Sequence, residues 1–156
     1  MKAFELLGRT VAREIFTIKE QGTIVERTQH LIEQCHPGAT KMKLIILGSE
    51  QSVAEIPYDQ SNRAPHGFLH GGCMYSVGDT LTAIMSEYFL ENPSERTLTM
   101  EGSIRYLRPV SRETVRVKAR LLSRNGKILN FVCDFFNEEN KRVAQAKYRY
   151  ALTSPL

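Results

Sequence analysis

The residues with the clearest chemical potential are the run His70-Gly71-Gly72 and the carboxylate of Asp79 that follows it. From Gly72 onward, apolar residues recur at helical spacing, so the two glycines stand at the start of a predicted helix. The first amides of a helix have no partner within it, and they lie at the positive end of the helix dipole. Such amides can hold a developing negative oxygen, and a carboxylate two turns further on could act as a base or a nucleophile.

Each of these residues also has a simpler interpretation. Asp79 lies off the apolar face of the predicted helix, where an acid can point to water or to an arginine in a structural ion pair. Gly71 and Gly72 would be needed wherever a loop turns sharply into a helix, and that role is compatible with presenting an N–H group. His70 would then be an ordinary loop histidine. The residues alone leave both interpretations of Asp79 open.

The predicted helix runs from Gly72 to about Leu90, and one of its faces is apolar. Gly78 lies on this face, where glycine costs about 1 kcal/mol but lets the helix approach a flat partner such as a sheet closely. The other residues of the face are Met74, Val77, Leu81, Ile84, Met85 and Tyr88.

Period-two patterns predict strands on both sides of this helix in the sequence. Asn125-Gly126 is a strong hairpin signal between two of them. One antiparallel sheet that buries the helix on one face accounts for the pattern, which gives an α+β fold. The strand patterns cover residues 43–47, 52–56, 97–108, 114–122, 128–136 and 143–152.

The composition fits one globular domain, with 156 residues, 42% of them hydrophobic and 24% charged. No apolar run is long enough to span a bilayer, so we expect no membrane association, and the early acid and arginine in Met1–Arg9 do not fit a secretory signal. Cys35, Cys73 and Cys133 have no metal spacing and cannot all pair, which favours a cytoplasmic setting. The net charge of +4 permits a polyanionic partner, but an excess this small is typical of a solvated surface.

Three segments carry a resemblance to a known family: residues 67–72 with Asp79, residues 99–110, and residues 124–127. Together they are similar to the hotdog-fold thioesterases, specifically the PaaI-like group related to 4-hydroxybenzoyl-CoA and phenylacetate-pathway thioesterases. The resemblance covers roughly residues 43–153. It implies a hotdog fold, which is a curved antiparallel sheet wrapped around one long central helix, and a homodimer or homotetramer. It also implies hydrolysis of an acyl-CoA, with coenzyme A as part of the substrate, no further cofactor, no metal and no nucleic acid.

The resemblance assigns roles to the candidate residues. Asp79 would be the general base on a water or the nucleophile. The Gly71 N–H would polarise the thioester carbonyl, and it would face Asp79 of a second subunit across a dimer interface. His70 would orient these groups, and Thr99 would orient the water, although Thr99 can also be an ordinary strand threonine.

Asn62 is a departure from the family pattern. The family usually has an asparagine six residues before the histidine of His-Gly-Gly, where its side chain helps to hold the thioester. Here that position is Ala64, and Asn62 lies two residues further back. A longer or bulged loop could bring Asn62 into place, or His66 could substitute for it. Asn62 can also be a simple turn former.

Several residues match segments that line the coenzyme A channel in similar proteins. Arginine suits phosphate through its fork of donors and lysine suits it as a point charge. The alternative for each residue is a solvated strand face or hairpin tip. The candidates are Gly72, Arg105, Tyr106, Arg108, Arg124, Gly126 and Lys127.

The sequence lacks the motifs of serine and cysteine nucleophiles and of nucleotide binding. Ser76 has no nucleophile elbow around it, Cys73 is best explained as a packing residue, and Cys35-His36 is not how a Cys/His pair is normally built. No phosphate-cradling loop or dinucleotide fingerprint is present.

The first 40 residues fall outside the resemblance, and we expect them to form a helical extension (1–40) to the hotdog domain (41–156). Helical spacing predicts helices over residues 3–18 and 24–35, the second stopped by Pro37-Gly38. The extension would pack on the domain, or it would form a lid over an acyl channel. Two other functions stay open: a non-catalytic module that binds acyl-CoA or an acyl-carrier protein, and an interaction protein that uses its N-terminal helices.

Overall fold

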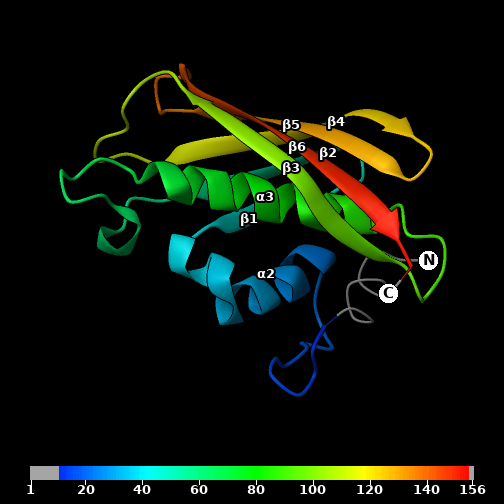
Figure 1. Cartoon of the computed structure of the whole chain (residues 1–156). Coiled ribbons are helices and arrows are strands. Elements are labelled where there is room, and N and C mark those ends of the chain that lie inside the picture. The colour runs from blue at the N-terminus through cyan, green and yellow to red at the C-terminus, as the bar shows by residue number, and fades with distance from the viewer. Residues whose placement is uncertain (1–10, 155–156) are drawn as a thin grey trace.

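The computed structural model describes residues 11–154. Six strands form one sheet in the order β1-β2-β4-β5-β6-β3, with every neighbouring pair antiparallel. The sheet curves around the long helix α3 (Figure 1), which confirms the predicted α+β hotdog fold. The strands are β1 (Lys43–Ile46), β2 (Gln51–Ile56), β3 (Arg96–Tyr106), β4 (Val115–Asn125), β5 (Ile128–Phe136) and β6 (Arg142–Thr153).

Helix α3 (Gly71–Glu87) lies against the concave face of the sheet and contacts β2 to β6. The predicted close approach at Gly78 is confirmed, because a Cβ there would meet the Tyr148 hydroxyl and lie 2.9 Å from a ring carbon. The hairpin at Asn125-Gly126 is also confirmed, with Gly126 at φ 60°. Burial of the apolar helix face against β4, β5 and β6 builds one continuous core, which fixes α3 relative to the strands.

Strand β3 is an edge strand with an irregular register. Its pairing with β6 shifts between Thr99 and Glu101, so Met100 is an extra residue in the ladder. Thr99 pairs with Tyr150, and Gly102 pairs with Tyr148, both of which face the core. The bulge therefore lets Thr99 and Gly102 both face α3, although they are three residues apart.

The N-terminal prediction holds in part. Helix α2 (Ile24–Gln34) forms, with a capping box between Thr23 and Glu26. The predicted helix over 3–18 is wrong for its described part, since residues 13–15 form a turn and residues 16–20 are irregular. The Gln34 side chain bonds both the N–H and the C=O of Thr17, which takes these backbone groups away from a helix. Residues 3–10 lie outside the described part of the chain.

Two short helices complete the elements, η1 (His36–Thr40) and η2 (Gln60–Asn62). Helix α2 lies beside β1 and η1, and Ile32 of α2 belongs to the core. The boundary predicted at residue 40 stays a prediction. Helix α3 ends earlier than Leu90, because Phe89 bonds Ser86 (3.1 Å) and Leu90 bonds Glu87 (3.3 Å) in tighter turns.

Candidate active site

Asp79 lies in the middle of α3 and is half-buried. Its Oδ1 accepts hydrogen bonds from the Thr99 hydroxyl (3.1 Å) and the Tyr150 hydroxyl (2.7 Å). Burial and the neighbouring Asp79 carboxylate raise the pKa of Tyr150, so the phenol keeps its proton and donates it. Among residues 11–154, no donor bonds the other oxygen, Oδ2. That oxygen is free to take a proton or to attack an electrophile.

The sequence patterns did not single out Tyr150. Its hydroxyl lies within hydrogen-bond distance of the Asp79 carbonyl (2.7 Å) and the Thr82 hydroxyl (2.8 Å), and the residue is 1% exposed. A usable signal was present, because residues 147–150 alternate between basic residues and tyrosines. Such alternation turns both tyrosines into the core, where a buried hydroxyl needs a polar partner. The carboxylate on the predicted central helix is such a partner.

His70 is the N-cap of α3. Its Nδ1 accepts the Gly72 N–H at 2.9 Å, and its own backbone N–H donates to the Asn62 carbonyl at 3.0 Å. The histidine thus occupies the Gly72 amide, while no acceptor in the described part of the chain takes the Gly71 N–H. The cap fixes the first turn of α3 and leaves one amide pointing out of the helix end.

A cleft of about 390 Å³ opens beside Gly71. The Tyr106 hydroxyl donates to the Gly71 carbonyl (2.7 Å), and a Cβ on Gly71 would lie 2.9 Å from the Tyr106 ring. A side chain at position 71 would therefore crowd the Tyr106 ring, whereas the backbone conformation of Gly71 is open to other residues. The cleft is mostly apolar or aromatic, with a cation at one wall, and its lining includes His66, Phe68, Met74, Tyr106 and Arg108.

Asp79 and the Gly71 amide do not meet within one chain. They are eight residues apart on the same helix, which is about 12 Å along its axis. A thioester carbonyl is far smaller than this separation. One chain therefore carries a carboxylate and a free amide, each of which lacks the other as a partner.

The structure gives Asn62 an internal role. The residue is 3% exposed, and its side-chain N–H groups donate to the carbonyls of Thr40 and Pro57, both at 3.0 Å. Both amide hydrogens are therefore used within the chain, and Asn62 ties the loop before α3 to η1. Its backbone carbonyl accepts the His70 N–H, which keeps the residue beside the start of α3, and a role for Asn62 in holding a substrate stays a prediction.

The predicted coenzyme A contacts fall into two groups at opposite ends of α3. Arg105, Tyr106 and Arg108 lie at the end of β3 and beyond it, near Gly71, and Arg108 donates to the Arg142 carbonyl (2.7 Å). The other group is the β4–β5 hairpin with Arg124, Gly126 and Lys127, near the C-terminal end of α3. There Arg124 and Lys127 both bind Glu91, at 2.9 and 3.2 Å, and Lys127 also pairs with Glu95.

The comparisons with known proteins give the family and agree with the fold. The family model of the thioesterase superfamily matches residues 66–144, which is just over half of the 156 residues. The chain belongs to the thioesterase superfamily. Its sequence is 25% identical over 71 residues to the protein ComA2 of Bacillus subtilis (strain 168), covering 46% of this chain and 56% of that relative. The match thus spans little more than half the length of that relative.

Solved structures of hotdog-fold thioesterases share the fold of this superfamily member. Thioesterase HI1161 from Haemophilus influenzae superposes with a TM-score of 0.77 at 20% identity, over 88% of this chain and 96% of the other. A mutant of thioesterase PA1618 from Pseudomonas aeruginosa gives 0.79 at 17% identity, over 89% and 100%. A hypothetical thioesterase from Streptococcus pneumoniae TIGR4, whose structure contains coenzyme A, gives 0.64 at 17% identity, over 72% and 89%.

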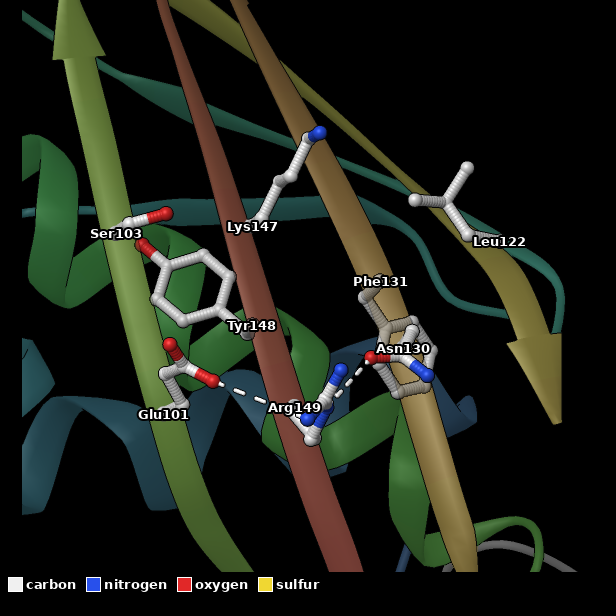
Figure 2. A pocket seen from close by; sticks show the side chains of 8 residues that line it. All are labelled: Glu101, Ser103, Leu122, Asn130, Phe131, Lys147, Tyr148 and Arg149. Atoms are coloured by element: carbon white, nitrogen blue, oxygen red, sulfur yellow. Dashed lines mark hydrogen bonds and ion pairs between the residues drawn. The ribbon is translucent and has the colours of Figure 1, made fainter. Parts of the chain in front are cut away.

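The thioesterase sheet has a second hollow on its outer face, away from α3, with a volume of about 220 Å³. Figure 2 shows its polar lining, in which Arg149 reaches toward Glu101 (3.9 Å) and Asn130 (3.0 Å). The sheet separates this hollow from Asp79. Within residues 11–154, no group of three His, Cys, Asp or Glu side chains could hold a metal ion, and no helix is long and apolar enough to cross a membrane.

Proposed function

We propose that this thioesterase hydrolyses an acyl-CoA to a free acid and coenzyme A, with Asp79 as the general base or the nucleophile. As a base, Asp79 takes a proton from the water whose oxygen attacks the acyl carbon. As a nucleophile, its Oδ2 attacks that carbon to give a mixed anhydride, which water then cleaves to the free acid and the restored carboxylate. In both routes the C–S bond breaks, and the thiolate leaves and takes up a proton that comes from the water. The observation that carries the proposal is the Asp79 carboxylate, fixed through Oδ1 by two hydroxyls while Oδ2 is free. A fixed carboxylate with one open oxygen suits both routes.

The oxyanion donor in this proposal is the Gly71 N–H of a second copy. In an isologous dimer, a contact between Gly71 and Asp79 is made twice, so two equivalent sites form. The edge strand β3 supports such a dimer, because its outer side offers unpaired backbone groups. Leu98 and Met100 on this strand are 55% and 56% exposed, which is unusual for large apolar side chains grouped on one edge.

The same dimer would explain the two separate groups of coenzyme A candidates. When Gly71 of one protomer lies opposite Asp79 of the other, the two α3 helices run antiparallel. The N-terminal end of one α3 then lies near the C-terminal end of the other. Arg108 of one protomer and the Arg124–Lys127 hairpin of its partner come to the same end of one site, where the coenzyme A phosphates would bind.

The test is Asp79→Asn, which keeps the size and removes the charge. We expect turnover to fall by about 10²- to 10⁴-fold in an assay of free thiol released from acyl-CoA. Asp134→Asn is the matched control, since Asp134 is a half-buried acid that binds Arg142 and Gln145 away from this site. Thiol release at an unchanged rate in a folded Asp79→Asn protein would show that Asp79 is not the reacting group.

A binding module without catalysis is the second candidate. The observation that favours it is Asn62, whose amide hydrogens are both used inside the chain, so no such amide is offered to a thioester here. Saturable coenzyme A binding with no thiol release across short, long and aromatic acyl-CoAs would support this candidate over the first.

A further inference from the structure

Tyr75 is a large residue of α3 that lies midway between Gly71 and Asp79. Gly71, Tyr75 and Asp79 follow one another at intervals of four residues along α3, so they form one stripe. The Tyr75 ring packs against Tyr148 at 5.4 Å between centroids, and the residue is half-buried. Among residues 11–154, no hydrogen bond uses the Tyr75 hydroxyl.

Strand β3 has a glycine, Gly102, at the point where the Tyr75 ring packs. A Cβ on Gly102 would meet the Tyr75 hydroxyl and would lie 2.9 Å from the carbon that bears it. The Tyr75 phenol therefore fills the place of the missing side chain, at the inner face of the edge strand. Burial and the neighbouring Tyr75 raise the pKa of Tyr106, which lines the cleft beside Gly71. Tyr75 thus lies between that cleft and Asp79.

The symmetry of the dimer places Tyr75 at its axis. This step rests on the proposed function, in which Gly71 of each protomer lies opposite Asp79 of the other. In antiparallel helices related by a two-fold axis, the residue midway between two such positions faces its own copy, and here that residue is Tyr75. Two phenols then stand between the two active sites.

The direction of the acyl group follows from charge. The basic residues Arg124 and Lys127 lie beyond Asp79, toward the C-terminal end of α3. Coenzyme A extends toward them, so the acyl group extends the other way along α3, toward the axis. Tyr75 is one helical turn from Asp79, which leaves about 6 Å along the axis. That length suits a short acyl chain or a single ring.

We propose that Tyr75 is the specificity-determining residue of this thioesterase, a wall at the two-fold axis that restricts the substrate to short-chain or single-ring acyl-CoA. The wild type hydrolyses butyryl-CoA or benzoyl-CoA in preference to dodecanoyl-CoA. Tyr75→Ala opens the wall, and the ratio of kcat/KM for dodecanoyl-CoA over butyryl-CoA rises by about ten-fold or more. Tyr75→Phe keeps the ring and holds that ratio within about two-fold of the wild type.

A second measurement tests the position of Tyr75 without using activity. In a Cys35→Ser background, which removes the one cysteine that is not buried, Tyr75→Cys is treated with a short bis-maleimide. A cross-linked dimer is expected. Ser76→Cys is the matched control, because the next residue points about 100° away around the helix and should not cross-link.

The outcomes separate the two proposals. If the wild type releases no thiol from any acyl-CoA, the proposed function is contradicted. The cross-linking result then still tests whether Tyr75 lies at the two-fold axis. An active enzyme whose chain-length profile is the same in Tyr75→Ala as in the wild type overturns the role of Tyr75 alone. Equal cross-linking at positions 75 and 76, or none at either, overturns its place at the axis.

Discussion

Two acids of α3, Asp79 and Glu87, each accept a hydrogen bond from a threonine of β3, but their burial and their other hydrogen-bond partners differ. Asp79 accepts a hydrogen bond from Thr99, and Glu87 accepts one from Thr97 (3.0 Å). Asp79 is half-buried and has a second donor in Tyr150, with one oxygen left open. Glu87 is 8% exposed, and its Oε2 is buried with no partner in the described structure.

The difference shows which kind of acid can work on a substrate. Burial raises the pKa of Glu87, so this side chain takes up a proton more readily than an exposed glutamate. A strongly buried acid is often taken as a sign of a functional site. Here, however, burial keeps the Glu87 carboxyl away from any substrate. Asp79 combines fixed geometry with an accessible oxygen, which is what a base or a nucleophile needs.

The largest effect expected from this comparison is that of Tyr150→Phe. The change removes the shorter of the two bonds to Asp79 Oδ1 and leaves the ring in place, so we expect kcat to fall by roughly ten-fold or more with little change in KM. Steady-state kinetics of thiol release measure it. Tyr148→Phe is the matched control, because the Tyr148 hydroxyl donates to the Tyr75 carbonyl on the same helix and not to Asp79 (2.7 Å).

Both tyrosine variants should lose similar stability, about 1 kcal/mol for one hydrogen bond. Urea unfolding of the two proteins checks this. An equal loss of kcat in Tyr148→Phe would mean that the effect of Tyr150→Phe comes from weaker packing of α3, and the orienting role of Tyr150 would then be wrong.

A smaller effect is expected from Glu87→Gln, and it depends on pH. Because the folded pKa of Glu87 lies above the unfolded one, the folded protein holds more protons between the two values. Wild-type stability therefore falls as the pH rises through that window, which begins near the ordinary glutamate value of about 4.3. The amide of the variant cannot ionise, so Glu87→Gln should gain stability relative to the wild type as the pH rises from about 4 to about 7.

Urea unfolding at several pH values measures this gain, and thiol release should stay close to the wild-type rate. Glu101→Gln is the control, since Glu101 is an exposed acid on the same strand as Thr97 and should show no such trend. A stability difference that does not change with pH in Glu87→Gln would mean that Glu87 ionises as easily in the folded chain as in the unfolded one.

The sequence predicted the parts of the site that depend on local patterns. Helical spacing placed His70 and Gly71 at a helix start and Asp79 two turns later, and the structure has them there. The close packing at Gly78 could also be predicted, since a glycine on an apolar helix face has few structural roles other than close approach.

The parts that could not be predicted depend on contacts between distant elements. Tyr150 reaches Asp79 across 71 positions through the β6 register, and the Met100 bulge decides that Thr99 faces the helix. The internal bonding of Asn62 has the same origin, because its side-chain amide donates to the carbonyl of Thr40, 22 residues away. Spacing along the chain does not report such pairings.

A third acid, Glu91, lies in the loop that follows the C-terminal end of α3. It binds both Arg124 and Lys127, and these two cations lower the pKa of its carboxyl. Because its side chain is 60% exposed, the pairs contribute little to stability. Glu91 does, however, compete with any phosphate for the same cations.

Glu91→Gln should therefore lower KM for acyl-CoA by about two- to three-fold, with kcat unchanged and a free energy of unfolding within about 1 kcal/mol of the wild type. The gain should shrink as salt is added, because exposed charges are screened. Glu139→Gln is the control, since Glu139 forms an equally exposed pair with Lys141 away from α3. A KM that does not respond to Glu91→Gln at low salt would place the coenzyme A phosphates elsewhere, and the exposed acid would then be only a surface ion pair.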